Sequence, residues 1–192
     1  MKFKLFGIQF EISFIFTAVL ALIAATDKTG DIIVFFVAAL IHETAHLVTM
    51  MFLKSKPRKI KLIPGGINIV DESVKTPTED ILILLSGPVS NLICFIIFKD
   101  VFSVVSLLLF IYNMMPIIGL DGGRILSILI SINFGVKASE KVLLTISIIF
   151  AILFILLFIY LFKNGVKNYS VLVFSLYLIS TLFLKKGVER IR

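Results

Sequence analysis

The stretch that decides the fold is Asp31–Leu53, which reads DIIVFFVAALIHETAHLVTMMFL. A membrane-spanning helix needs roughly 20 mostly apolar residues, and this run is long enough to form one. Its middle nevertheless contains His42, Glu43 and His46 in the order His-Glu-Thr-Ala-His. Ionisable groups near the middle of a span cost roughly 2.5–3.5 kcal/mol each on insertion scales, so a stabilising partner is required. A bound metal ion would be such a partner.

The two histidines have the spacing of a metal site. Histidines four residues apart on a helix project from the same face, one turn apart, so both rings can reach one zinc ion. Glu43 stands beside the first histidine and can take a proton from a water molecule at the metal. The chain has two histidines, and both are in this motif. The alternative, ordinary polar residues on a helix face, leaves their place inside an apolar run unexplained.

The composition is that of a membrane protein. Of the 192 residues, 59% are hydrophobic and 16% are charged, and the mean hydropathy is +1.09. Soluble domains usually have about a quarter of their residues charged. The net charge of +7 would suit a nucleic-acid partner, but the lysines and arginines lie in short gaps between apolar runs, where orientation signals belong. We therefore expect no nucleic-acid partner.

Apolar runs predict an α-helical polytopic membrane protein with about six transmembrane helices, one of them discontinuous. They cover residues 12–27, 32–53, 80–98, 101–134, 141–162 and 169–184. The fourth run is too long for one straight span, and Pro116, Gly119, Gly122 and Gly123 interrupt it. We interpret it as a single crossing with an irregular middle. Unwound backbone at that depth is tolerated only where it is buried in protein or lines a polar cavity.

Two stretches outside the apolar runs predict strands. Residues 2–12 alternate partly at a period of two, and residues 59–70 have apolar runs on both sides of Pro64-Gly65-Gly66, which predicts a β-hairpin. The strands have two alternative roles. They seal the ends of the helices, or a free strand edge captures an extended substrate by backbone pairing. With no long linker, residues 1–192 are expected to form a single membrane-embedded domain.

The distribution of basic residues predicts the orientation. An even number of crossings puts both termini on one side of the membrane. Of the 19 lysines and arginines, fourteen lie in segments on that side, four lie in the opposite loops, and Arg124 lies within a span. Cytoplasmic segments carry an excess of Lys and Arg, so we expect a multi-pass protein of the cell membrane with both termini and the strands in the cytosol.

A third metal ligand has to come from an acidic residue. A catalytic zinc takes three protein ligands and leaves a fourth position open, and no further histidine is available. Asp121 lies deep in the broken fourth run. Pro116 removes a backbone donor and the neighbouring glycines permit unusual dihedral angles, so the chain can bend Asp121 toward the metal. The alternatives are a buried ion pair between Asp121 and Arg124, or a cap on the following helix.

Three motifs together resemble the site-2 protease family of intramembrane zinc metalloproteases, and they cover residues 32–134. They are the His-Glu-Thr-Ala-His motif, Gly87-Pro88-Val89-Ser90-Asn91, and the stretch that runs from Asn113 through Pro116 to Asp121 and Gly122. Six spans with a hairpin after the motif helix resemble the stage IV sporulation protease branch of the FB type, without its nucleotide-sensing CBS domain.

The resemblance implies a zinc metalloendopeptidase, with Zn2+ bound by His42, His46 and Asp121. It implies that Glu43 is the general base. Asn91 would be catalytic too, because a neutral amide at membrane depth can position the substrate or donate a hydrogen bond to a developing oxyanion. The alternative role of Asn91 is an interhelical hydrogen bond.

The resemblance also implies the partners. The substrate would be a membrane-associated or transmembrane protein, such as a pro-sigma factor in sporulation, and membrane inhibitor proteins and the lipid bilayer would be further partners. The rival class is a zinc-binding or zinc-transporting membrane protein without protease activity. Transport predicts several ligand sets along a path, whereas this sequence has one compact cluster and no histidine-rich loop.

Overall fold

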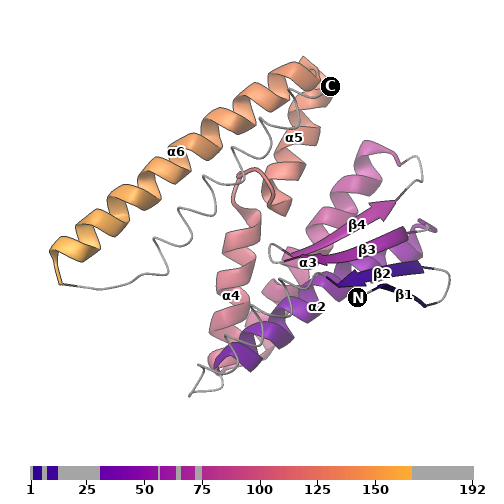
Figure 1. Ribbon diagram of the computed structural model, residues 1–192, viewed down its shortest axis with the longest axis horizontal. Helices are drawn as coiled ribbons and strands as arrows, with labels where there is room; N and C mark the ends of the chain where they lie inside the picture. The colour runs from indigo at the N-terminus through magenta and orange to yellow at the C-terminus, as the bar shows by residue number, and fades with distance from the viewer. Residues whose placement is uncertain are drawn as a thin grey trace. The chain divides into compact units, whose positions relative to one another are not determined.

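The computed structural model describes residues 2–5, 8–12, 31–55, 57–63, 66–71 and 75–165. It divides into two compact units, residues 1–112 and 113–192, which are described separately. The helices, labelled in Figure 1, are α2 (Asp31–Phe52), α3 (Pro77–Ile97), α4 (Val101–Met114), α5 (Asp121–Phe134) and α6 (Val136–Lys163). Apart from Ile12, the predicted spans 12–27 and 169–184 lie outside the described residues.

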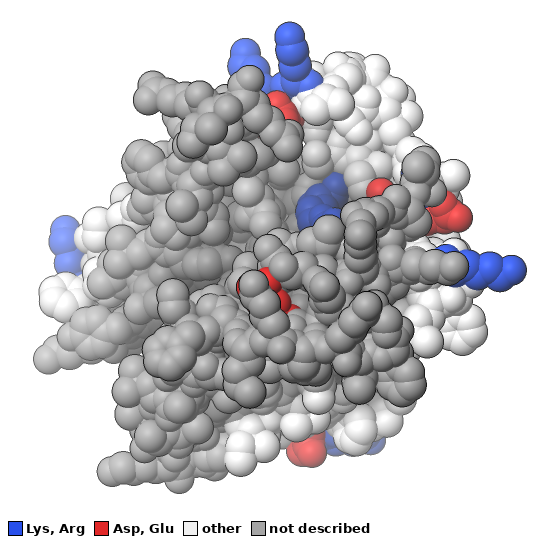
Figure 2. Space-filling model, turned by 45° about the vertical axis from the view of Figure 1, so that its right-hand side comes forward, with Lys and Arg blue, Asp and Glu red and all other residues white. Residues whose placement is uncertain are grey.

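Three of the helices, α2, α3 and α6, are long and apolar enough to cross a membrane, and α4 is a shorter apolar helix. They correspond to the predicted runs 32–53, 80–98 and 141–162, so the polytopic helical fold is confirmed in this part of the chain. Large apolar side chains are exposed along these helices, for example Leu40 at 60% and Met51 at 71%. The exposed apolar side chains suit a lipid environment. Figure 2 shows charged side chains in separate groups, not in one continuous patch, among the described residues of the face that it presents.

The long fourth run is interrupted, as the sequence predicts. Helix α4 ends at Met114, and α5 begins at Asp121 after a non-helical stretch, residues 115–120. Each helix has 14 residues and is therefore about 21 Å long, less than the roughly 30 Å of a hydrocarbon core. That the two together make one crossing stays a prediction.

Four strands form one sheet in the order β1-β2-β3-β4 (Figure 1). They are β1 (Lys2–Leu5), β2 (Ile8–Ile12), β3 (Pro57–Ile63) and β4 (Gly66–Asp71). β3 and β4 pair antiparallel and make the predicted hairpin, while β2 pairs parallel to β3. The amino-terminal segment, expected as a single strand, instead forms the antiparallel pair β1 and β2.

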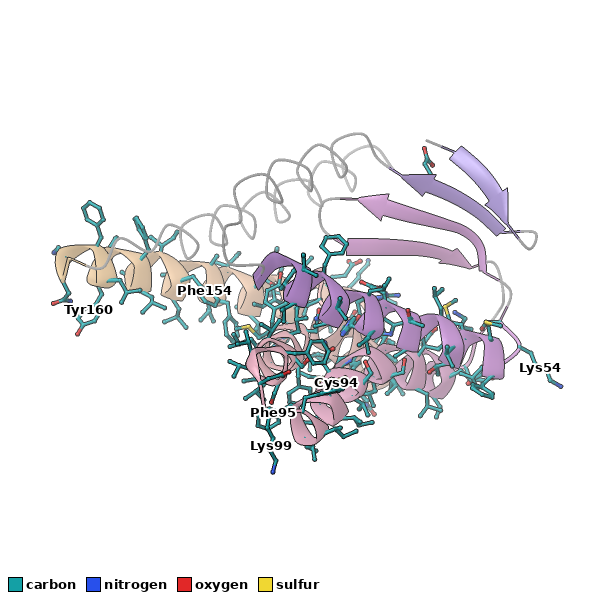
Figure 3. All side chains as sticks on the ribbon, turned by 90° about the horizontal axis from the view of Figure 1, so that it is seen from below. Lys54, Cys94, Phe95, Lys99, Phe154 and Tyr160 are labelled. Carbon is teal, nitrogen blue, oxygen red and sulfur yellow. The ribbon has the colours of Figure 1, made fainter. Side chains whose placement is uncertain are left out.

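Helices α2 and α3 pack antiparallel through stripes of residues spaced four apart. The register is fixed because His46 contacts Ile83 while His42 contacts Asn91. The buried residues of the α2 stripe are Ala38, His42, His46 and Met50, and those of the α3 stripe include Ile83, Gly87 and Asn91. Rows at this spacing are the ridges through which helices commonly interdigitate. Lys54 and Lys99 follow the two helices at opposite ends of the pair (Figure 3).

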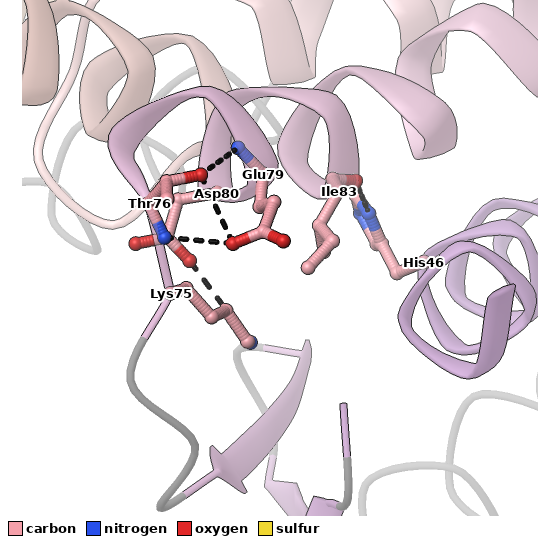
Figure 4. A network of polar contacts seen from close by, with 6 residues as sticks. All are labelled: His46, Lys75, Thr76, Glu79, Asp80 and Ile83. Carbon is pink, nitrogen blue, oxygen red and sulfur yellow. Dashed lines mark hydrogen bonds and ion pairs between the residues drawn. The ribbon is translucent and has the colours of Figure 1, made fainter. Parts of the chain in front are cut away.

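A capping box fixes the start of α3 (Figure 4). The Glu79 backbone N–H donates to Thr76 Oγ1 at 3.3 Å, and the Glu79 carboxylate accepts from the Thr76 backbone N–H at 2.7 Å. These bonds satisfy backbone donors that lack a partner in the first turn of any helix. Pro77, the first helical residue, supplies a backbone angle that already suits a helix.

Replacing Thr76 with alanine should lower the free energy of unfolding by about 1 kcal/mol, because the cap is lost. Thermal unfolding of the detergent-solubilised chain, followed by circular dichroism, would measure the effect. Thr78→Ala is the matched control, since Thr78 is exposed in the first turn of α3 and has no capping role. Equal midpoints for the two variants would contradict the role of the capping box.

Candidate metal centre

The two histidines lie on the buried face of α2. His42 is 4% exposed and His46 is 7% exposed, although large apolar side chains elsewhere on α2 face outward. The four-residue spacing places the rings one above the other, as the sequence predicts. Glu43, the next residue after His42, is half-buried. The helix therefore offers two imidazoles to the interior of the first unit.

The two rings converge through the same nitrogen. Nε2 of His42 lies 3.1 Å from Nε2 of His46, and the rings are nearly perpendicular at 85°. Two nitrogens bound to one tetrahedral zinc at about 2.0–2.1 Å would lie roughly 3.3–3.4 Å apart. The observed separation is close to that value, so both Nε2 atoms can bind one ion with little movement of the helix.

A backbone carbonyl of α3 orients the second ring. Nδ1 of His46 lies 2.6 Å from the carbonyl oxygen of Ile83, and the Ser86 hydroxyl is 3.4 Å from the same nitrogen (Figure 4 shows the first contact). A carbonyl oxygen can only accept, so Nδ1 of His46 is the protonated nitrogen and Nε2 carries the lone pair. Metal-binding histidines commonly donate their other N–H in this way.

Asn91 supports the first ring. Its side chain is 0% exposed, and its amide group lies 3.1 Å from Nδ1 of His42. This contact is an interhelical hydrogen bond between α3 and α2, which was one of the two roles that the sequence left open. The amide oxygen Oδ1 has no partner among the residues that the structure describes.

Gly87 makes room for both rings. It is buried on α3 midway between Ile83 and Asn91. A Cβ at this position would lie 2.6 Å from Cε1 of His46 and 2.7 Å from Nε2 of His42. Real side chains do not approach so closely, so the rings can meet here only because residue 87 has no side chain.

Asp121 is the first residue of α5, in the second unit, and is half-buried. The N-cap residue of α5 is Leu120, whose side chain makes no capping hydrogen bond. Among the described residues Arg124 is exposed and forms no ion pair, which argues against the proposed Asp121–Arg124 pair. The carboxylate of Asp121 is a ligand candidate by its donor type.

The bend before Asp121 is held by contacts within the second unit. The Ser147 hydroxyl of α6 accepts a hydrogen bond from the Ile118 backbone N–H at 2.9 Å and donates one to the Leu143 carbonyl at 2.8 Å. Gly119 has φ +94°, a backbone conformation that glycine adopts without strain and other residues rarely adopt. A Cβ at Gly123 would lie 2.6 Å from the carbonyl carbon of Ile117. The glycines thus let α5 begin directly against the bend.

The donor types suit zinc. His42 and His46 offer imidazole nitrogens and Asp121 offers a carboxylate oxygen. Zinc binds this combination readily, and three protein ligands leave a fourth position for water or substrate. The residues fit Zn2+ as the cofactor.

Sequence reasoning missed two contributors to this centre. The Ile83 carbonyl belongs to the backbone, and the residue type at that position carries no information about it. Gly87 was noted as part of a motif, but its close approach to the rings was not anticipated. The signal that would have found both is the four-residue spacing of Ile83, Gly87 and Asn91, which matches that of His42 and His46.

Replacing Gly87 with alanine should abolish tight zinc binding, because the new methyl group would occupy the space in which the rings meet. Zinc affinity, measured by competition with a chromophoric chelator in detergent, tests this. Val89→Ala is the control on the same helix, since Val89 faces outward. Circular dichroism would establish that both variants remain helical, and zinc affinity equal to that of the parent chain would contradict the close approach.

Comparisons with known proteins find similar proteins. No family model matches the chain. A curated zinc metalloprotease of Methanocaldococcus jannaschii, Zinc metalloprotease MJ0392, is 28% identical over 165 residues, which cover 73% of this chain and 48% of that protein. The chain therefore spans about half the length of this relative.

The fold has a counterpart among solved structures. The site-2 protease from Methanocaldococcus jannaschii matches with a TM-score of 0.69 and 22% sequence identity, over 96% of this chain and 94% of that one. The chain thus has the fold of a site-2 protease, as the resemblance of the motifs implied.

Proposed function

We propose that the chain is an intramembrane zinc metalloendopeptidase that hydrolyses a peptide bond in a membrane-associated or transmembrane protein. The observation that carries the proposal is the pair of buried imidazoles, whose Nε2 atoms lie 3.1 Å apart on a helix apolar enough to span a membrane. The similarity to a zinc metalloprotease and to the site-2 protease fold supports it.

The proposed ligands are His42, His46 and Asp121, and bound zinc would supply a Lewis acid for the substrate carbonyl and for water. Glu43 acts as the general base. It follows His42 directly, is half-buried, and a carboxylate in this place can take a proton from water and deliver it to the leaving amine. Asn91 acts with them, because it is buried beside His42 and the N–H groups of its amide can donate a hydrogen bond to the substrate carbonyl.

The substrate has to reach the site as an extended segment. All backbone groups of a transmembrane helix are bonded internally, so a helical substrate must unwind before cleavage. β1 and β4 are the outer strands of the described sheet, and their outward backbone groups offer a template for such a segment. A pro-sigma factor is the proposed example, on the strength of the motif resemblance alone.

We also propose that both termini are cytosolic. Lys54 and Lys75 lie at the same end of the antiparallel α2–α3 pair, since one follows α2 and the other precedes α3. In the orientation inferred from the basic residues, this end faces the cytosol. Membrane inhibitor proteins remain proposed partners by resemblance.

Replacing Glu43 with glutamine should leave zinc binding intact and lower peptide cleavage by at least about 100-fold, because the general base is lost. Parent and variant would be reconstituted with membrane proteins of the host, and newly formed amino termini identified by mass spectrometry. Glu140→Gln is the control, since Glu140 is exposed on α6. Equal cleavage by the parent and Glu43→Gln would defeat the mechanism, and zinc binding without cleavage by the parent would favour the transport class.

Replacing Asp121 with alanine should weaken zinc binding by more than about 100-fold, beyond the range usual for partners of metal ligands. Zinc content after dialysis against a weak chelator would measure the change. Asp80→Ala serves as the control, because Asp80 loses only a 3.9 Å ion pair with Lys75. Unchanged stoichiometry in Asp121→Ala would remove Asp121 from the metal site.

A further inference from the structure

The two imidazoles of the metal centre are supported from one face of α3. Nδ1 of His46 faces the carbonyl oxygen of Ile83, and Nδ1 of His42 faces the amide of Asn91. A neutral imidazole carries one N–H, so the group that faces Nδ1 decides whether Nε2 keeps its lone pair. The supporting groups therefore decide which nitrogens can bind a metal.

For His46 the partner fixes which ring nitrogen carries the proton. The carbonyl of Ile83 accepts only, so Nδ1 donates and Nε2 keeps its lone pair. For His42 the partner is an amide, which offers a donor at one end and an acceptor at the other. If the amide donated to Nδ1, Nε2 would carry the proton and could not bind zinc. If the amide accepted from Nδ1, both rings would have a protonated Nδ1 and a lone pair on Nε2.

Zinc binding through Nε2 of His42 requires the amide to accept, and the amide of Asn91 can be turned to do so. Its nitrogen Nδ2 is the atom 3.1 Å from the ring, and its oxygen Oδ1 is buried without a partner in the described residues. A half-turn of the amide exchanges the two ends with almost no change of shape. In the turned position Oδ1 accepts from Nδ1–H of His42. Nδ2 then takes the former place of Oδ1, where no partner lies among the described residues.

We infer that Asn91 is a positioning residue for the metal: its amide oxygen accepts from Nδ1–H of His42 and thereby holds Nε2 of that ring ready to bind zinc. The inference rests on the proposed zinc site. Ile83 and Asn91 lie eight residues apart on α3, with Gly87 midway between them. They contact His46 and His42 respectively, which lie four residues apart on α2. Outer partners of this kind fix both the tautomer and the direction of a metal-binding ring.

Two substitutions of Asn91 separate acceptance from mere helix contact. Asn91→Leu keeps the approximate shape but cannot accept, and we expect the zinc dissociation constant to rise about 10–100-fold. Asn91→Asp retains an acceptor oxygen and should bind zinc within about tenfold of the parent chain. Ser106→Ala is the control, because Ser106 is also buried, and its hydroxyl has no partner among the described residues. Competition with a chromophoric chelator on the full-length chain in detergent gives these constants.

Parental affinity in Asn91→Leu would overturn the inference, and so would an Asn91→Asp variant as weak as Asn91→Leu. A second measurement needs no folded variant. The chain has two histidines, so nitrogen-15 NMR of the zinc-loaded parent can assign both rings. We expect a protonated Nδ1 in both His42 and His46, and an unprotonated Nδ1 in His42 would contradict the proposal.

Failure of this inference is distinguishable from failure of the proposed function. A parent chain that binds no zinc would remove both. A parent chain that binds zinc and cleaves substrate, with Asn91→Leu binding zinc equally well, would remove the role of Asn91 alone.

Discussion

The Nε2 atoms of two imidazoles must converge between two apolar helices, and the rest of the site follows from that constraint. Nε2 of His42 and Nε2 of His46 lie 3.1 Å apart, which requires a neighbouring helix without a side chain where they meet. Gly87 provides that space, and Ile83 and Asn91 on either side of it hold the opposite nitrogens. Since α3 runs antiparallel to α2, a single four-residue repeat on each helix satisfies all of these contacts. The metal site is thus a property of helix packing as much as of its ligands.

Polar groups at membrane depth are tolerated only when they are paired. The hydrogen bonds from α3 satisfy one nitrogen of each ring, and a metal ion would satisfy the other, which offsets the cost of placing the histidines in an apolar helix. A polar group is paired in the same way in the second unit, where the Ser147 hydroxyl accepts a hydrogen bond from the Ile118 backbone N–H in the break between α4 and α5. Non-helical backbone in such a protein needs partners of this kind, because lipid offers none.

The sequence predicted those features that depend on residue type and local spacing. The histidine pair, the interruption around Pro116 and Gly119, the β-hairpin and the spans of α2, α3 and α6 all belong to this group. It did not reveal the Ile83 carbonyl, because a backbone acceptor exists at every position. It left the role of Asn91 open, because the register between α2 and α3 is set by packing. The part of Ser147 was out of reach for the same reason, since its partner lies 29 residues away.

The central claim is that zinc is held by two imidazoles and one carboxylate. X-ray absorption at the zinc edge of the purified full-length chain tests this most directly, because scattering from imidazole rings is distinctive and Zn–N and Zn–O distances of about 2.0–2.2 Å are well separated from Zn–S distances of about 2.3 Å. The account predicts two imidazoles and additional oxygen ligands around a single zinc per chain. A spectrum with sulfur ligands, with fewer than two imidazoles, or with no bound zinc would contradict it.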